Sequence, residues 1–501
     1  MTEGSSTASP RSTRGWLARG GSLGFVGAAG SAVLGFALTI MLTRMLGSQG
    51  AGVVMQATGV FALVVALSKV GMDSTVIYLL PRLVPSEPGE VRRTLTFMSL
   101  VAVSVSTAAA LVLIALAPLV WAAQGQTLVA VIRAVAWFLP AQALLLVATA
   151  ALRALGGMRE YVLVQNLALP LLRPPAVALA VLATSSLVIV GLAWAAPLVL
   201  VLAVALLLLS RKLRAWPSDP PGRLLPQGRR TREILAFATP RTLAAGLEQA
   251  IVWLDVLLVG TLLGDGAAGI YGGASRFIQA GMLVDSALRI VVSPKLSALV
   301  KERRLEELRD LHATATTWLV LFASPIYVLM AVYSPTLMTV LGEGFGQGAP
   351  VVVVLSVGAC TTFLAGNIHT LLIMSGHSGW AAWNKVVVLV LNVVGNLVLV
   401  PWAGIVGAAA SWALCMVVDA VLASVQVRHL LGVRLGFAQY LVPLGVVLVS
   451  VGVPAALVLT WWGQSLWALA ISCVLSLLCF GAACIVWRGP LKLQGILDKR
   501  S

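Results

Sequence analysis

The chain has few charged residues and few of the groups that metal or redox chemistry uses. Charged residues make up 10% of its 501 residues, whereas soluble domains carry roughly one quarter. It has four histidines and five cysteines, and the cysteines lie scattered inside apolar runs. It contains no Gly-rich phosphate loop ending in Lys-Ser or Lys-Thr and no His-Glu-x-x-His motif. We therefore expect no disulfide framework, metal, cofactor or built-in ATPase.

The residues that remain are mostly apolar. Hydrophobic residues make up 59% of the chain and its mean hydropathy is +0.98. Run after run is apolar on every face for about 20 residues, the length that spans a bilayer. The sequence predicts an all-α membrane protein with about fourteen transmembrane helices, near residues 22–45, 51–73, 95–121, 127–151, 162–183, 187–209, 234–261, 267–291, 313–335, 348–374, 384–401, 404–427, 440–461 and 465–487.

The basic residues fall on one side of this arrangement. With the N-terminus inside, all but seven of the 34 Lys and Arg residues lie in the tails, in alternate loops or at Lys385. This is a positive-inside pattern, which predicts a multi-pass plasma-membrane protein with both termini cytoplasmic. The net charge of +16 is therefore attributed to membrane topology, and no nucleic-acid partner is expected.

Polar interruptions divide the chain into segments. The longest is a Pro- and Arg-rich stretch between the sixth and seventh predicted helices. The predicted organisation is a disordered cytoplasmic N-tail at 1–20, a six-helix bundle at 21–209, a cytoplasmic linker at 210–233, a second six-helix bundle at 234–430, helices thirteen and fourteen within 431–487, and a cytoplasmic tail at 488–501.

The two predicted bundles carry an internal repeat. LGSQGAGV at 46–53 matches LGDGAAGI at 263–270, which aligns Gly47 with Gly264 and Gly52 with Gly269. About thirty residues later YLLPRL resembles VVSPKL. Repeated halves are typical of secondary transporters, in which one half rocks against the other around a site near the midplane. The repeat therefore favours transport.

The chain resembles the polysaccharide transporter, or oligosaccharide flippase, branch of the multidrug/oligosaccharidyl-lipid/polysaccharide exporter superfamily. The resemblance rests on GSLGFVGAAGSAVLGFALTIMLTRMLGSQGAGV, on LLGDGAAGIYGGASRF and on the turns LRALGGMREY and LIMSGHSGWAAWNK. It implies two pseudo-symmetric six-helix bundles around a central cavity, with two added C-terminal helices. It also implies a bacterial inner-membrane flippase that turns an undecaprenyl-diphosphate-linked oligosaccharide to the outer leaflet without ATP hydrolysis, for surface polysaccharide assembly.

Cations inside the predicted helices are candidates for binding the diphosphate. A charge at the bilayer centre costs about 2.5–3.5 kcal/mol, so such residues line a wet cavity or pair with one another. Guanidinium offers a donor fork that matches phosphate oxygens. Arg173 is the first candidate, because it lies in mid-span between Pro170 and Pro174. The other candidates are Arg133, Arg44, Lys69 and Arg276.

Acidic residues inside the helices are candidates for binding a coupling ion, either a proton or sodium. These are Glu248, Asp255 and Asp419. Structural ion pairs are also expected: Lys69 with Asp73 on one helix face, and interhelical pairs between Asp255 and Arg276 at equal depth and between Arg241 and the region of Asp285 to Arg289. Asn392 and Asn396 predict helix-to-helix hydrogen bonds, and Tyr271 is interpreted as an interfacial anchor.

Other functions remain open. A peptidoglycan-precursor (lipid II) flippase and a cation-coupled multidrug exporter are the alternatives within transport. A scaffold for a glycan-assembly complex is the alternative outside transport, and a polysaccharide polymerase or glycosyltransferase is a candidate partner in either case. An enzyme is not expected, because the predicted outer loops are short and their only acids are Asp265 and Glu343.

Overall fold

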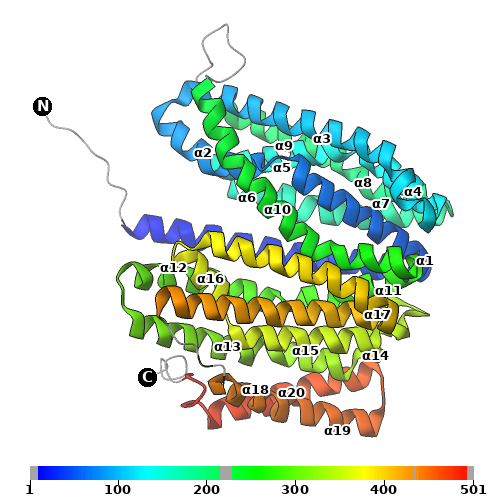
Figure 1. The fold of residues 1–501 in the computed structure, drawn as a ribbon, viewed down its shortest axis with the longest axis vertical. Coiled ribbons are helices and arrows are strands. Elements are labelled where there is room, and N and C mark those ends of the chain that lie inside the picture. The colour runs from blue at the N-terminus through cyan, green and yellow to red at the C-terminus, as the bar shows by residue number, and fades with distance from the viewer. Residues whose placement is uncertain (1–9, 215–227, 433–435, 437, 494–501) are drawn as a thin grey trace, which may run out of the picture. The chain divides into compact units, whose positions relative to one another are not determined.

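The protein is described from a computed structural model, which covers residues 10–214, 228–432, 436 and 438–493. Every secondary-structure element in these ranges is helical (Figure 1). The prediction of an all-α, multi-pass membrane protein is confirmed. Parts of the predicted N-tail (1–9), linker (215–227) and C-tail (494–501) lie outside the described residues.

The chain forms two compact units. The first comprises Met1–Leu38 and Val60–Gly246, and the second comprises Thr39–Gly59 and Leu247–Ser501. Residues 39–59 are thus part of the second unit although the sequence repeat assigns them to the first half. The two long helices that contribute to both units are α1 (Pro10–Ser68) and α10 (Gly228–Leu263).

The other helices each belong to one unit. The first unit contains α2 (Met72–Ser86), α3 (Val91–Trp121), α4 (Gln126–Ala136), α5 (Leu139–Ala154), α6 (Met158–Tyr161), α7 (Leu169–Ala183), α8 (Leu187–Ala195) and α9 (Pro197–Leu213). The second contains α11 (Asp265–Gly281), α12 (Leu283–Lys301), α13 (Leu305–Val332), α14 (Ser334–Leu341), α15 (Ala349–Ala365), α16 (Ile368–Met374), α17 (Ser378–Leu431), α18 (Leu441–Val447), α19 (Val453–Trp462) and α20 (Leu466–Val486).

Ten helices in the described residues are long and apolar enough to cross a membrane, or eleven if the bent pair α4 and α5 counts as one span. Two of the ten, α1 and α17, contain a break, at Gly47 and Gly404. These breaks coincide with predicted boundaries between spans, but the count of fourteen stays a prediction. Leucines that are 78–80% exposed, such as Leu119 and Leu182, fit a surface that faces lipid.

The start of α1 differs from the prediction. The sequence predicts a disordered tail that includes residues 10–20, whereas α1 begins at Pro10. Once the apolar part of the helix has formed, each further residue adds one hydrogen bond at little cost, so the helix extends into the Gly- and Arg-containing segment.

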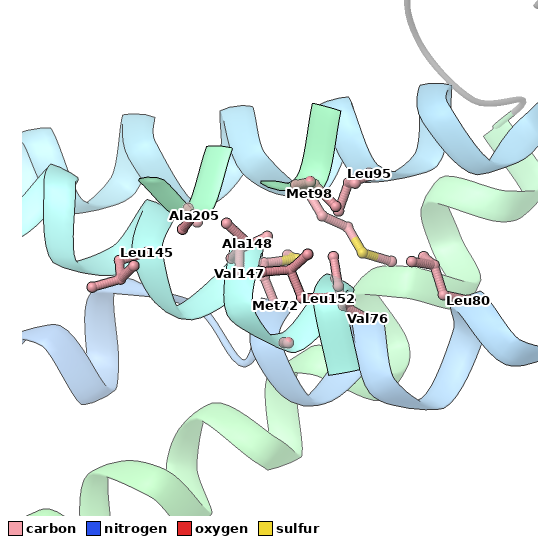
Figure 2. Packing of buried hydrophobic residues seen from close by; sticks show 14 of the residues in the cluster. Met72, Val76, Leu80, Leu95, Met98, Leu145, Val147, Ala148, Leu152 and Ala205 are labelled. Atoms are coloured by element: carbon pink, nitrogen blue, oxygen red, sulfur yellow. The ribbon is translucent and has the colours of Figure 1, made fainter. Parts of the chain in front are cut away.

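A large apolar cluster packs several helices of the first unit together. Side chains of α2, α3, α5 and α9 meet there, as Figure 2 shows for Met72, Met98, Leu152 and Ala205. Alanines on α5 and α9 allow these helices to approach closely. At the edge of this unit Tyr78 of α2 stacks on Phe237 of α10, with ring centroids 4.1 Å apart.

The second unit is built around α13, α15 and α17, which lie side by side (Figure 1). The two arms of α17 run antiparallel, because Asn384 bonds Gln426 and Ser411 bonds the backbone of Asn392. Helices α18 to α20 pack on α13, where the Tyr333 hydroxyl lies 2.6 Å from the Ser472 hydroxyl.

Two pairs of glycines related by the sequence repeat organise one end of the second unit. Gly47 and Gly264 both have positive φ, 67° and 91°, and each marks the point where a helix breaks or begins. Gly52 and Gly269 face each other directly. A Cβ on Gly52 would collide with the Asp265 carbonyl, and a Cβ on Gly269 would collide with the Ser48 carbonyl. The repeat-related turns therefore meet in a symmetric crossing, which we call the glycine crossing.

We predict that Gly52→Ala destabilises the protein, because the new Cβ meets backbone atoms that cannot move aside. Overpacking of this kind costs about 1–3 kcal/mol, so the midpoint of thermal unfolding should fall by roughly 1–3 °C in detergent. Gly35→Ala on the same helix is the matched control, since its Cβ meets nothing within 4 Å. Equal midpoints for the two variants would contradict the tight crossing.

Candidate functional site

Arg173 lies in the second turn of α7, which directly follows a π-helical segment at Val162–Ala168, and Arg173 directly precedes Pro174. Its side chain is half-buried. The guanidinium carbon lies 4.0 Å above the ring of Trp194, and Nε donates a hydrogen bond to the Trp194 carbonyl at 3.2 Å. Trp194 is buried against Phe61 in an edge-on contact. Because α8 ends at Ala195, carbonyls of its last turn are free to accept such a bond.

Arg276 of α11 has the same arrangement in the second unit. Its guanidinium carbon lies 4.5 Å above the buried ring of Trp253, and Nη1 donates to the Gln279 side chain at 2.9 Å. Within the described residues, neither Arg173 nor Arg276 has a carboxylate at ion-pair distance. A cation held by an aromatic face keeps its full positive charge and its remaining N–H donors.

The other candidate cations have different surroundings. Arg44 is exposed and donates to the Val340 carbonyl at 2.8 Å, so it caps the last turn of α14. Arg133 is exposed in the last turn of α4. Lys69 forms an ion pair with Asp73 across 2.6 Å, beside the break between α1 and α2. These contacts leave Lys69 and Arg44 less available for a ligand than Arg173 and Arg276.

Asp255 of α10 is fully enclosed by neutral hydrogen-bond donors. Its Oδ1 accepts from the side-chain amides of Asn392 and Asn396, each at 2.9 Å, and its Oδ2 accepts from the Tyr271 hydroxyl at 3.0 Å. All four side chains are buried. The Oδ1 of Asn396 finds no hydrogen-bond partner among the described residues. This cluster, which we call the Asp255 cage, holds a carboxylate that has no ion pair with a Lys, Arg or His of the described ranges.

The cage corrects two predictions. Asp255 does not pair with Arg276, because Arg276 is turned to Trp253 and the space around Asp255 is filled by the two asparagines. Tyr271 is not an interfacial anchor, since it is 2% exposed and donates to Asp255. The predicted helix-to-helix hydrogen bonds of Asn392 and Asn396 are present, and their acceptor is the carboxylate.

The remaining acids are either exposed or paired with a cation. Glu248 is exposed on α10. Asp285 forms an ion pair with Arg289 one turn further along α12. Asp419 is buried in α17 and pairs with Lys385 at 2.8 Å, and the Nε2 atom of His369 lies 2.9 Å from the same carboxylate oxygen. Sequence reasoning missed His369, because a single histidine carries no periodic signal.

A cavity of about 640 Å³ lies beside the glycine crossing. Its polar lining is supplied by Ser48, Gln49 and Gln347, and Gly266 and Gly404 also line it. Next to it the buried Gln56 donates to Asp265 at 2.6 Å. The cavity thus gathers uncharged hydrogen-bonding groups where four chain turns meet.

Comparison with known proteins adds a family and a fold. A model of the family described as polysaccharide biosynthesis protein matches residues 17–300. The "Probable low-salt glycan biosynthesis flippase Agl15" of Haloferax volcanii is 25% identical over 192 residues, which are 37% of this chain and 40% of that relative. The matched segment therefore spans well under two thirds of the relative's length.

Solved structures of similar fold cover most of the chain. A lipid II flippase, MurJ, in an inward closed conformation has a TM-score of 0.68 at 12% identity, covering 92% of this chain and 98% of that one. An inward-facing multidrug resistance MATE transporter has a TM-score of 0.65 at 13% identity, covering 80% and 94%. A MOP superfamily transporter from Pyrococcus furiosus has a TM-score of 0.59 at 13% identity, covering 83% and 95%. At these identities the likeness shows the fold alone.

We predict that the Asp255 cage contributes to stability through its hydrogen bonds. Asp255→Leu removes the acceptor and leaves the Asn392 amide and the Tyr271 hydroxyl unpaired, while the Asn396 amide keeps its bond to the Asn392 carbonyl. Each unsatisfied group costs about 1–3 kcal/mol. Asp255→Asn keeps an acceptor of the same shape. Thermal unfolding followed by tryptophan fluorescence should show a clear fall in the midpoint for the leucine variant and a much smaller one for the asparagine variant. Equal midpoints would mean that the three bonds contribute nothing.

Proposed function

The chain belongs to the polysaccharide biosynthesis protein family, whose members are membrane transporters of the MOP superfamily rather than enzymes, and from this premise we propose that it is a flippase for an undecaprenyl-diphosphate-linked oligosaccharide. The proposed movement is from the inner to the outer leaflet by alternating access. The proposed purpose is surface polysaccharide assembly in a bacterial inner membrane, with both termini cytoplasmic.

The observation that carries this proposal is the pair of arginines held on tryptophan rings, one in each unit. Arg173 and Arg276 are half-buried within apolar helices and have no carboxylate partner among the described residues. Keeping an unpaired cation at such depth is costly, so its retention points to a ligand of opposite charge. A diphosphate supplies that charge and accepts several hydrogen bonds from a guanidinium fork.

The Asp255 cage supports coupling to an ion gradient. A buried carboxylate with neutral donors only is a site where a proton or a sodium ion neutralises the charge. The oxygens of Asp255, Asn396 and Tyr271 are hard ligands of the kind that alkali and alkaline-earth cations accept. Of the three candidate acids, Asp255 is therefore the proposed coupling site, whereas Glu248 is exposed and Asp419 is already neutralised by Lys385.

The excess of cations also bears on the alternative functions. An exporter of lipophilic cations needs an acidic wall, whereas Arg173 and Arg276 are half-buried cations with no carboxylate partner among the described residues. A lipid II flippase carries a cargo with the same diphosphate. Only the sugar part of the cargo therefore distinguishes that function from the proposed one. A polymerase or glycosyltransferase complex is the proposed source or consumer of the cargo.

We predict that Arg173→Ala abolishes most of the flipping activity. Losing charge-assisted hydrogen bonds to the diphosphate should lower transport by about tenfold or more. The measurement is the leaflet distribution of lipid-linked glycans in cells that carry only the variant, alongside surface polysaccharide. Arg82→Ala is the matched control, because Arg82 also lies on an aromatic ring, 3.7 Å from the centroid of Tyr78, but is exposed near the end of α2. Normal surface polysaccharide with Arg173→Ala would contradict the proposed role.

We also predict that Asp255→Asn separates transport from the ion gradient. The substitution preserves the shape of the cage but removes the charge that a proton or sodium ion neutralises. Flipping in proteoliposomes should respond to an imposed proton or sodium gradient in the wild type and lose that response in the variant. A variant that retains the full response would place the coupling site elsewhere.

A further inference from the structure

The cavity beside the glycine crossing is built from four chain turns of the second unit. Ser48 and Gln49 follow the break in α1, Gly266 lies in the first turn of α11, Gln347 lies in the 3₁₀ turn after α14, and Gly404 is the break in α17. Figure 1 shows α11 and α14 at the same end of this unit. The four turns follow the first, seventh, ninth and eleventh predicted helices, so in the proposed topology they face outward. The volume of about 640 Å³ is that of a ligand pocket.

The internal repeat is not exact where this cavity lies. It aligns Gln49 with Gly266 and Ser48 with Asp265. A Cβ on Gly266 would lie 3.6 Å from Gln49 Cγ and 3.7 Å from Ser48 Oγ, which are ordinary contact distances. A glutamine at residue 266, as the repeat would have it, would therefore compete with Gln49 for the same space. The glycine leaves that space open to a ligand.

The polar groups that line the cavity are uncharged and uncommitted. Ser48, Gln49 and Gln347 form no side-chain hydrogen bond with another residue that the structure describes. A glutamine amide offers two N–H donors and a carbonyl acceptor, and a serine hydroxyl both donates and accepts. The first backbone bond of α11 runs from Ala268 N–H to Gly264, so the N–H groups of Gly266 and Ala267 have no acceptor within the helix. The cavity thus presents donors and acceptors together.

The charged groups beside the cavity are already engaged. Asp265 accepts a hydrogen bond from Gln56 at 2.6 Å, and Arg44 donates to the Val340 carbonyl at 2.8 Å. Among the described residues that line the cavity there is no Lys, Arg, His, Asp or Glu. The Asp265 carboxylate also places a negative charge in the first turn of α11, where an anion would otherwise be favoured. The cavity is therefore a poor receptor for a charged ligand.

The lining selects one class of ligand. An anion finds no cationic side chain there, a metal ion finds no carboxylate, and an apolar molecule would leave both glutamine amides unpaired. A saccharide carries no charge and many hydroxyls, each of which donates and accepts. We propose that the cavity binds a short neutral saccharide through Gln49, Gln347 and Ser48, with the free backbone N–H groups of α11 as further donors.

This sugar site is distinct from the proposed diphosphate site. Gly266 and Arg276 are both on α11, about 15 Å apart along the helix at 1.5 Å per residue. In the proposed topology the cavity opens on the outer side, where it would hold the sugar part of a cargo that has crossed the membrane. That use rests on the proposed function, whereas the binding of a free saccharide does not.

The test is saturation-transfer NMR of the purified protein in lipid nanodiscs, with the methyl glycosides of glucose, galactose, mannose and N-acetylglucosamine as separate probes. The wild type should transfer saturation to the ring protons of at least one probe. Binding of that probe should weaken by about tenfold or more in Gln49→Ala/Gln347→Ala, which removes both amides, and in Gly266→Gln, which fills the space. Glu343→Gln is the matched control, because Glu343 is exposed on the turn of Gln347 but does not line the cavity; it should bind as the wild type does.

An absence of transfer to every probe, or equal binding by the wild type and Gln49→Ala/Gln347→Ala, would overturn the proposal. If the variants do not fold, a diazirine derivative of the bound probe maps the site in the wild type: labelled peptides that contain residues 48–49 or 344–347 support the proposal, and labelling confined to other peptides overturns it. None of these measurements needs transport. A wild type that binds the probe in the cavity but flips no lipid-linked glycan would refute the proposed function and leave the sugar site standing.

Discussion

A charge placed inside apolar helices has to be neutralised, hydrogen-bonded or laid against an aromatic face, and the polar interior of this protein is organised by that constraint. The chain uses all three solutions. Lys69 and Asp73 neutralise each other, Asp255 is hydrogen-bonded by three neutral groups, and the two mid-helix arginines lie on tryptophans. These three arrangements differ in the net charge that they leave for a ligand to bind.

That difference separates structural from functional candidates. An ion pair such as Asp285 with Arg289 is complete, and an incoming ion would have to displace a partner. An arginine on a tryptophan ring retains a net positive charge, and the Asp255 cage retains a net negative one. The positive sites suit the anionic cargo and the negative site suits a coupling cation. One physical constraint thus accounts for both halves of the proposed transport cycle.

Much of the fold could be predicted from the sequence. The apolar runs located the helices, and the repeat found Gly47 with Gly264 and Gly52 with Gly269, because glycine readily adopts the positive φ at the breaks and its missing Cβ allows the close approach at the crossing. Hydropathy could not reveal that residues 39–59 pack with the second unit. A segment has the same amino-acid composition whichever of the two units buries it.

The candidate site could be predicted only in part. Counting residues from the turn between α10 and α11 predicts that Asp255 and Arg276 lie at equal depth. Depth along a helix does not, however, fix the direction in which a side chain points around the helix axis. Tyr271 and Arg276 are five positions apart, about 140° around α11, so only one of them can face Asp255, and it is the tyrosine. The tryptophans beneath the arginines and His369 beside Asp419 are contacts between distant segments that no local pattern encodes.

The central claim is that the two unpaired arginines serve an anionic lipid-linked cargo. The most direct measurement is transport by the purified protein alone, reconstituted in liposomes that contain undecaprenyl-diphosphate-linked oligosaccharide in one leaflet and a fluorescent lipophilic cation in the lumen. The account predicts that the glycan lipid crosses to the other leaflet while the cation does not move. Movement of the cation with the glycan lipid left in place would contradict it.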